Sequence, residues 1–246
     1  MFSPDPLEQL DRGVRLITFD RPGYGESSDV AVGSLSVVAE TIASIADDLG
    51  LEKVAIAGFS GGGPYAFACG ALIPERVSRI AAVSSWGPID EVEAAYESLS
   101  AAERDLLSAI RAEPASAKEL LWEHGRWFAD TPLLMFESQH EAADESTLSD
   151  PTIRSNLAAA NVEGARQGQA GLVTDWAAEA LPWGFRLADI GVPVNLWVGE
   201  RDPGRAPLDA LEIKGRIPSC AVHAVTGAGH WLVVPYWPDV LRSLEA

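Results

Sequence analysis

The pattern of apolar and polar positions predicts strands that alternate with helices. Five short runs are rich in valine and isoleucine and are bounded by turn residues, which is typical of buried strands. They are VRLITF (14–19), KVAIAG (53–58), VSRIAAVSS (77–85), VNLWVG (194–199) and AVHAVTG (221–227). Because strands that alternate with helices need crossover connections, we expect an α/β fold with a mostly parallel central sheet and flanking helices.

The segment between the first two runs has a helical period. Gly50 follows it as a C-terminal stop signal. The apolar residues that share one face of this helix are Leu35, Val38, Ile42, Ile45 and Leu49.

The alternation stops between about Pro88 and Phe185, where no convincing strand pattern occurs. SAAE (100–103) and SAKE (116–119) each fit a capping box, and Asp150-Pro151 is a further helix start. We therefore expect a helical insertion at 88–186, with residues 1–87 and 187–246 forming the α/β core.

Large apolar side chains in the insertion are expected to pack it onto the main body of the protein, and lining a pocket is the alternative role for some of them. They are Trp122, Trp127, Phe128, Met135 and Phe136.

Composition narrows the possible partners and locations. The formal net charge of −18 would repel a phosphate backbone, so nucleic acid is not an expected partner, and solubility is a sufficient reason for the charge. Cys69 and Cys220 fit no metal-ligand pattern and are expected to be buried, reduced thiols. The N-terminal residues do not have the pattern of a signal peptide, and no run approaches the ~18 apolar residues of a membrane span. We expect a cytoplasmic protein with no membrane association.

The pentapeptide Gly58-Phe59-Ser60-Gly61-Gly62 contains the first candidate for chemistry. It lies between a predicted strand and a helical pattern, which is the context of a nucleophile elbow. A tight turn would push the serine hydroxyl clear of the sheet, and side chains at Gly58 and Gly62 would clash across it. A flexible glycine loop is the alternative interpretation.

A serine nucleophile needs a base, and the base needs an orienting acid. Asp202 and His230 each follow a predicted strand, and the carboxyl ends of parallel strands lie along one edge. Glu200 is an alternative acid. The other three histidines do not follow a strand end among glycines: His124 and His140 lie in the insertion, and His223 lies inside a predicted strand.

These motifs resemble the α/β-hydrolase family of serine hydrolases. FDRPGYGES (19–27) is similar to the loop after the fourth strand of many members, and GAGHW (227–231) is similar to their histidine loop. The resemblance, from about Val14 onward, implies that Ser60 is the nucleophile, His230 the general base and Asp202 the orienting acid. It also implies that the N–H of Gly61 is half of the oxyanion hole, and that residues 88–186 form a cap over the acyl pocket.

The chain departs from the family pattern at its start. Members usually have three strands before the one that resembles VRLITF, and the third ends in a His-Gly loop that supplies a second oxyanion N–H. Only about a dozen residues precede VRLITF here. Three interpretations stay open: a true start further upstream, a fragment, or a natural variant that closes the gap differently. As the sequence stands, we expect an α/β-hydrolase fold whose sheet is N-terminally incomplete.

The sequence therefore predicts a serine hydrolase that acts on a small ester, thioester or amide through an acyl-enzyme. An apolar acyl group is expected because the insertion is rich in Trp, Phe and Leu. No metal or organic cofactor is implied. The alternative is a catalytically silent chain that binds a small ligand or a partner.

Overall fold

The computed structural model describes residues 13–31, 33–131 and 142–245, which form two compact units. The sheet unit consists of residues 34–101 and 182–245. The helical unit consists of the described residues up to Gly33 and those within 102–181.

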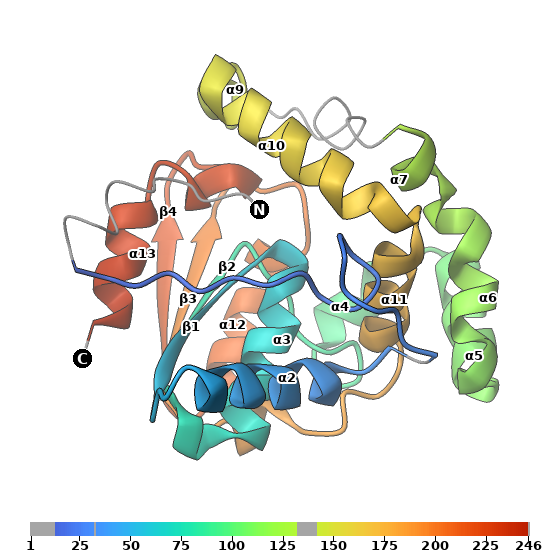
Figure 1. The fold of residues 1–246 in the computed structure, drawn as a ribbon, viewed down its shortest axis with the longest axis horizontal. Coiled ribbons are helices and arrows are strands. Elements are labelled where there is room, and N and C mark those ends of the chain that lie inside the picture. The colour runs from blue at the N-terminus through green and yellow to red at the C-terminus, as the bar shows by residue number, and fades with distance from the viewer. Residues whose placement is uncertain (1–12, 32, 132–141, 246) are drawn as a thin grey trace. The chain divides into compact units, whose positions relative to one another are not determined.

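The sheet unit contains four parallel strands in the order β1-β2-β3-β4. Figure 1 shows the strands side by side, with helices of the same unit around them. Four of the five predicted strands are therefore confirmed. The elements of this unit are α2 (Leu35–Asp48), β1 (Val54–Phe59), η1 (Ser60–Gly62), α3 (Gly63–Leu72), η2 (Pro74–Arg76), β2 (Val77–Val83), α4 (Glu93–Glu97), η6 (Leu187–Asp189), β3 (Val194–Gly199), α12 (Ala206–Arg216), β4 (Cys220–Val225), η7 (His230–Val233) and α13 (Trp237–Leu244).

The core of the sheet unit lies around the two inner strands. Every residue of β3 is buried, as expected for a parallel strand that is covered on both faces. Phe67 of α3, Ile80 of β2 and Leu196 of β3 are completely buried. Gly70 lets α3 approach the sheet, since a Cβ there would lie 2.6 Å from Cδ1 of Ile80. This packing holds the elements that carry the candidate site.

Helix α2 is confirmed with a small shift of its buried face. The Ser34 hydroxyl accepts the N–H of Ser36 at its start, and Gly50 follows its end with a φ of 65°. Leu35 and Val38 are buried as expected, but Leu49 is 38% exposed. The core side of the helix also includes Ala39 and Ala46.

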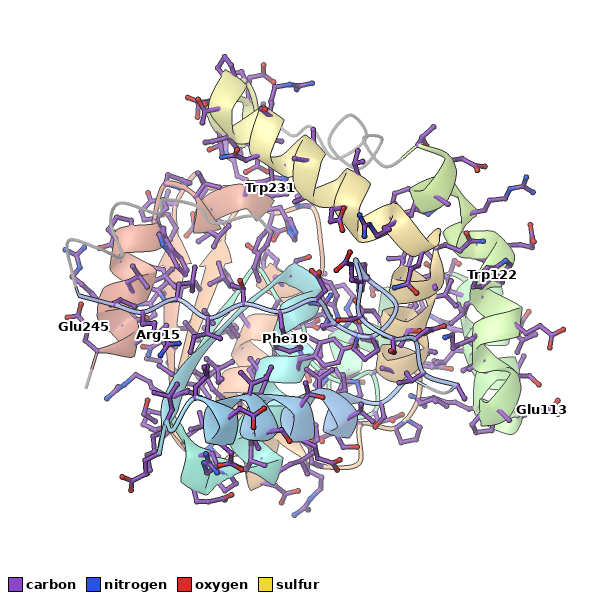
Figure 2. The ribbon with its side chains drawn as sticks, viewed as in Figure 1. Arg15, Phe19, Glu113, Trp122, Trp231 and Glu245 are labelled. Carbon is purple, nitrogen blue, oxygen red and sulfur yellow. The ribbon has the colours of Figure 1, made fainter. Side chains whose placement is uncertain are left out.

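The prediction of a buried strand at 14–19 is wrong. This segment has no regular secondary structure, and Leu16 is 39% exposed. Figure 2 marks its residues Arg15 and Phe19. A strand needs a neighbouring strand for its N–H and C=O groups, and among the described residues β1 pairs only with β2.

The helical unit contains no strand among its described residues. An insertion bounded at 88–186 stays a prediction. Ile110, Leu121 and Val173 form a buried cluster that joins three of its helices. The elements are α5 (Ala101–Ala112), η3 (Pro114–Ser116), α6 (Ala117–Trp122), η4 (Glu123–Gly125), α7 (Arg126–Asp130), α9 (Glu145–Leu148), α10 (Pro151–Gly164), η5 (Ala165–Gln167) and α11 (Ala170–Ala180).

The predicted helix starts have mixed outcomes. The Asp150 carboxylate caps α10 by accepting the N–H groups of Thr152 and Ile153. Helix α5 begins directly after Ser100, as predicted. Ser116 makes no capping hydrogen bond, which contradicts a capping box at 116–119. It ends the short helix η3, so its backbone does not have the extended geometry that a cap needs.

The loop that contains FDRPGYGES is bound to α11 within the helical unit. The guanidinium of Arg21 donates to both oxygens of Asp175, and the hydroxyl of Tyr24 donates to the same carboxylate over 2.8 Å. Burial, followed by the negative charge of Asp175, raises the pKa of Tyr24 well above its ordinary value. The buried Asp175 is therefore neutralised and hydrogen-bonded, as a carboxylate inside a protein must be.

A second ion pair holds the same loop. The Lys118 ammonium contacts the Asp29 carboxylate over 2.6 Å, and the Thr174 hydroxyl donates to it over 3.0 Å. Burial alone would raise the pKa of Asp29, but hydrogen bonds from Lys118, from the Val30 N–H and from Thr174 outweigh that effect, so its pKa is lowered.

The large apolar residues that the sequence analysis expected to pack against the main body differ in burial. Phe128 is buried and packs edge-on against Tyr24 and Trp127. Trp122 on α6 is 41% exposed and is therefore not a core residue (Figure 2). Met135, Phe136 and His140 lie outside the described residues.

Both cysteines are free thiols, as predicted, although only Cys69 is fully buried. Burial raises the pKa of Cys69 to about 12 and that of Cys220 to about 11. Among the described segments, no helix combines the length and the apolar character needed to cross a membrane.

Candidate active site

A strained turn joins β1 to α3. Ser60, directly after β1, has a φ of 52°, and among the described non-glycine residues only Ser84 shares such a positive value. Side chains adopt this conformation with difficulty, and it persists where the surrounding structure holds it, often at functional sites. Ser60 therefore lies in the strand–turn–helix arrangement that the sequence predicts.

The glycines of this turn differ in whether the structure has room for a side chain. A Cβ at Gly58 would overlap the carbonyl of Gly62, as expected. The same expectation for Gly62 is wrong, because no described heavy atom lies within 4 Å of a Cβ there and its backbone is right-handed helical. The second tight position is Gly63, where a Cβ would overlap the Ser85 hydroxyl.

Gly58→Ala is expected to lower the free energy of unfolding by about 3 kcal/mol, because the new methyl group meets backbone that cannot move aside. Gly62→Ala is the matched control. It is expected to leave that free energy unchanged or to raise it by up to about 1 kcal/mol, because alanine is favoured in helical backbone. Urea denaturation followed by circular dichroism measures both. Equal losses in the two variants would contradict the assignment of the tight contact.

The three residues proposed from the sequence as a triad lie in contact. His230 Nε2 is 3.1 Å from Ser60 Oγ, and His230 Nδ1 is 2.9 Å from Asp202 Oδ2. The Asp202 side chain is completely buried, and its Oδ1 accepts the N–H of Gly204 over 2.8 Å. A buried carboxylate held in this way can orient an imidazole and stabilise its protonated form.

The ends of β3 and β4 bring the acid and the histidine together. The N–H of Arg201 donates to the Ala228 carbonyl over 2.9 Å, and that of Glu200 donates to the Val225 carbonyl over 3.1 Å. A Cβ at Gly199 would overlap the carbonyls of Ala228 and Gly229, so glycine permits this close approach. The loops of Asp202 and His230 are therefore fixed by backbone contacts.

The alternative acid and the other described histidines have different environments. Glu200 is exposed, whereas the buried Asp202 occupies the Nδ1 side of the imidazole. His124 is exposed in η4 of the helical unit. His223 stacks on Trp197 within the sheet unit with ring centroids 4.2 Å apart, and burial lowers its pKa.

Phe59 has a role beyond its place in the elbow motif. Its ring centroid lies 5.2 Å from that of His230 and 5.3 Å from that of Trp231. Trp231 is marked in Figure 2 and is buried in η7, the short helix that begins with His230. The aromatic side chain before the serine therefore packs against the histidine turn.

The sequence analysis did not single out Ser84 and Ser85. Both are completely buried at the end of β2, and their hydroxyls donate to the backbone carbonyls of His230 and Ser60, respectively. Their signal in the sequence is two adjacent polar residues directly after the apolar stretch 80–83.

Among the residues that the structure describes, no group of three or more His, Cys, Asp or Glu side chains is placed to hold a metal ion. The polar groups described at this site are the serine, the imidazole, the carboxylate and the backbone amides around them.

A family model described as the alpha/beta hydrolase family matches residues 1–242. The chain belongs to the alpha/beta hydrolase family. Its relatives include proteins with hydrolase names, and the protein is a hydrolase.

Two relatives align over most of the chain. A Bacillus subtilis protein, provisionally named 2-succinyl-6-hydroxy-2,4-cyclohexadiene-1-carboxylate synthase, is 27% identical over 91% of this chain and 77% of its own length. A 2-hydroxy-6-oxononadienedioate/2-hydroxy-6-oxononatrienedioate hydrolase of Burkholderia vietnamiensis is 28% identical over 89% of this chain and 71% of its own length.

A solved structure of a hydrolase from Pseudomonas aeruginosa shares the fold, with a TM-score of 0.66 and 18% identity. It aligns over 97% of this chain and 82% of that chain.

Proposed function

We propose that this hydrolase cleaves a small carboxylic ester, thioester or amide through an acyl-enzyme, with Ser60, His230 and Asp202 as its catalytic triad. The observation that carries the proposal is the continuous pair of contacts from Ser60 Oγ through the imidazole to the buried Asp202 carboxylate. A serine hydroxyl is a weak nucleophile alone and is activated by such a base.

The proposed reaction follows from the positions of these atoms. Ser60 Oγ attacks the substrate carbonyl carbon while His230 Nε2 takes the hydroxyl proton, and Asp202 stabilises the resulting imidazolium. The imidazolium then gives its proton to the leaving group, which departs and leaves an acyl-serine. Water, activated by the same imidazole, attacks the acyl-serine and restores the free hydroxyl.

We propose the backbone N–H of Gly61 as a donor to the oxyanion of the tetrahedral intermediate. Gly61 lies in η1, directly before α3, and the first amides of a helix have no carbonyl partner within it. The positive end of the helix dipole favours negative charge at this position. Each such donor typically contributes about 10²- to 10³-fold to turnover.

The proposed substrate is a small molecule with an apolar acyl group, in keeping with the aromatic composition of the insertion. The prediction that residues 88–186 form a cap stays a prediction, as does the cytoplasmic location.

A second candidate reaction uses the same residues. Two relatives that align over most of the chain are named for a synthase and for a hydrolase of a keto-dienedioate. We therefore propose, as the alternative, hydrolysis of the carbon–carbon bond next to a ketone, in which the leaving group is a stabilised carbanion rather than an alkoxide. Turnover of 2-hydroxy-6-oxononadienedioate, with little turnover of p-nitrophenyl butyrate, would favour this alternative.

Labelling with a fluorophosphonate tests whether Ser60 is an activated nucleophile. The native chain is expected to gain one phosphonyl group, located at Ser60 by peptide mass spectrometry, because only a serine with an adjacent base reacts at a useful rate. Urea-unfolded protein should not react. Ser60→Ala should remove the label without changing the circular dichroism spectrum.

Ser36→Ala provides the matched control, since Ser36 lies on α2, where its hydroxyl contacts that of Ser34. This variant should label as the native chain does. A folded native sample that takes no label, or that keeps its label in Ser60→Ala, would contradict the triad and favour a silent chain that only binds.

A further inference from the structure

Two adjacent serines at the carboxyl end of β2 contact the backbone of two triad residues. Ser84 and Ser85 are completely buried, and a buried hydroxyl without a partner is destabilising. The Ser84 hydroxyl donates to the His230 carbonyl over 2.7 Å. The Ser85 hydroxyl donates to the Ser60 carbonyl over 2.9 Å. The end of one strand therefore contacts the backbone of both the proposed nucleophile and the proposed base.

The Ser85 contact acts on the peptide unit between Ser60 and Gly61. A peptide bond is planar and trans, so the Ser60 carbonyl and the Gly61 N–H belong to one rigid plane and point in opposite directions. The carbonyl accepts from Ser85 and also from the N–H of Gly63, which occupies both of its lone pairs. Fixing the carbonyl in this way fixes the direction of the Gly61 N–H.

The same contact makes the Gly61 N–H a better donor. A hydrogen bond to the carbonyl of an amide polarises the amide, so its N–H is attracted more strongly to an acceptor. The Ser85 side chain is confined where it lies, because it packs so closely against Gly63 that a Cβ there would overlap the hydroxyl.

Ser84 contacts the other half of the site. Its φ is 49°, and its N–H donates to the Trp197 carbonyl of β3 over 2.8 Å, so strand pairing continues to this residue. Its hydroxyl then reaches the backbone of His230, whose ring contacts Ser60 and Asp202. A non-glycine residue in a left-handed conformation indicates that the surrounding structure requires its side chain or its backbone there.

We propose that Ser84 and Ser85 are positioning residues for the hydrolysis. Ser85 orients the Gly61 N–H toward the developing oxyanion. Ser84 holds the His230 backbone and so fixes the position of the imidazole relative to Ser60. The inference rests on the proposed function, because it assigns a role within the triad reaction.

Ser85→Ala tests the first role with p-nitrophenyl butyrate as substrate. We expect kcat to fall about 10- to 10²-fold with KM changed by less than about threefold, since the oxyanion forms only after binding; complete loss of a donor costs about 10²- to 10³-fold. Butylboronic acid forms a tetrahedral adduct on serine, so its inhibition constant should rise in proportion to the fall in kcat/KM.

Ser84→Gly tests the second role without adding strain. Glycine adopts a positive φ readily, so relief of the backbone strain offsets the lost hydrogen bond and the melting temperature should stay close to native. Its kcat should nevertheless fall about tenfold, because the His230 carbonyl loses its donor. Lower turnover in an equally stable protein separates positioning from a merely structural role.

Ser243→Ala is the matched control for loss of a hydroxyl. The Ser243 hydroxyl also donates to a backbone carbonyl, that of Val240, over 2.7 Å on α13, and it accepts from the indole of Trp197. It should lower the melting temperature with kcat unchanged. A native kcat in both Ser85→Ala and Ser84→Gly, with Ser60-dependent turnover intact, would overturn the positioning roles and leave the proposed function standing. Turnover that does not depend on Ser60 would overturn both.

Discussion

His230→Ala is expected to lower kcat for p-nitrophenyl butyrate by about 10⁵- to 10⁶-fold, the loss seen when a triad histidine is removed alone. The variant retains the serine, but the hydroxyl at 3.1 Å from Nε2 loses the group that takes its proton. The Phe59 and Trp231 rings that pack around the imidazole should keep the turn folded.

The control for this variant is His124→Ala. His124 is exposed in η4, which belongs to the helical unit, whereas Ser60, Asp202 and His230 belong to the sheet unit. Its kcat should match that of the native chain. Steady-state kinetics with active-site titration separates a slow enzyme from a small active fraction. A loss below tenfold in His230→Ala would show that the histidine is not the base.

Asp202→Asn is expected to lower kcat about 10⁴-fold, because it would stabilise the tautomer of His230 that cannot act as a base. Asparagine can still accept the N–H of Gly204 through its oxygen, as Asp202 does. Its NH₂ group would then face Nδ1, which must become an acceptor, so the ring proton moves to Nε2. An imidazole protonated at Nε2 cannot take the proton from Ser60.

Glu200→Gln is the matched control, because Glu200 is the other carboxylate near the end of β3. It is exposed, and its replacement should change kcat by less than about twofold. A large loss in Glu200→Gln together with a small loss in Asp202→Asn would exchange the two assignments. Neither substitution changes side-chain volume appreciably, so melting temperatures should stay close to native.

Much of the fold and of the candidate site could be predicted from patterns of apolar and turn residues within short segments of the sequence. The four strands of the sheet are apolar runs with turn residues at their ends, and each lies within two residues of its predicted bounds. Ser60, Asp202 and His230 meet because parallel strands present their carboxyl ends at one edge. That rule needs only the order of the elements along the chain, which is why the contacts among these three residues could be predicted.

The errors concern interactions with residues distant in sequence. VRLITF has the composition of a buried strand, but composition does not tell whether a neighbouring strand is present to pair with it. Gly62 has the spacing of the motif, yet the tight contact at that end of the turn belongs to Gly63, because the Ser85 side chain arrives there from β2. Ser84 and Ser85 could not be linked to Ser60 and His230 from the sequence, because that link depends on the pairing of β2 between β1 and β3.

The left-handed conformation of Ser60 predicts which residue this position would acquire in the absence of selection on chemistry. A serine held at a φ of 52° costs on the order of 1–3 kcal/mol relative to an unstrained residue, and glycine would relieve most of that cost. Mutation without selection on chemistry should therefore drift toward glycine at this site, since the change stabilises the chain. Retention of serine at this position among relatives would therefore indicate selection for its hydroxyl.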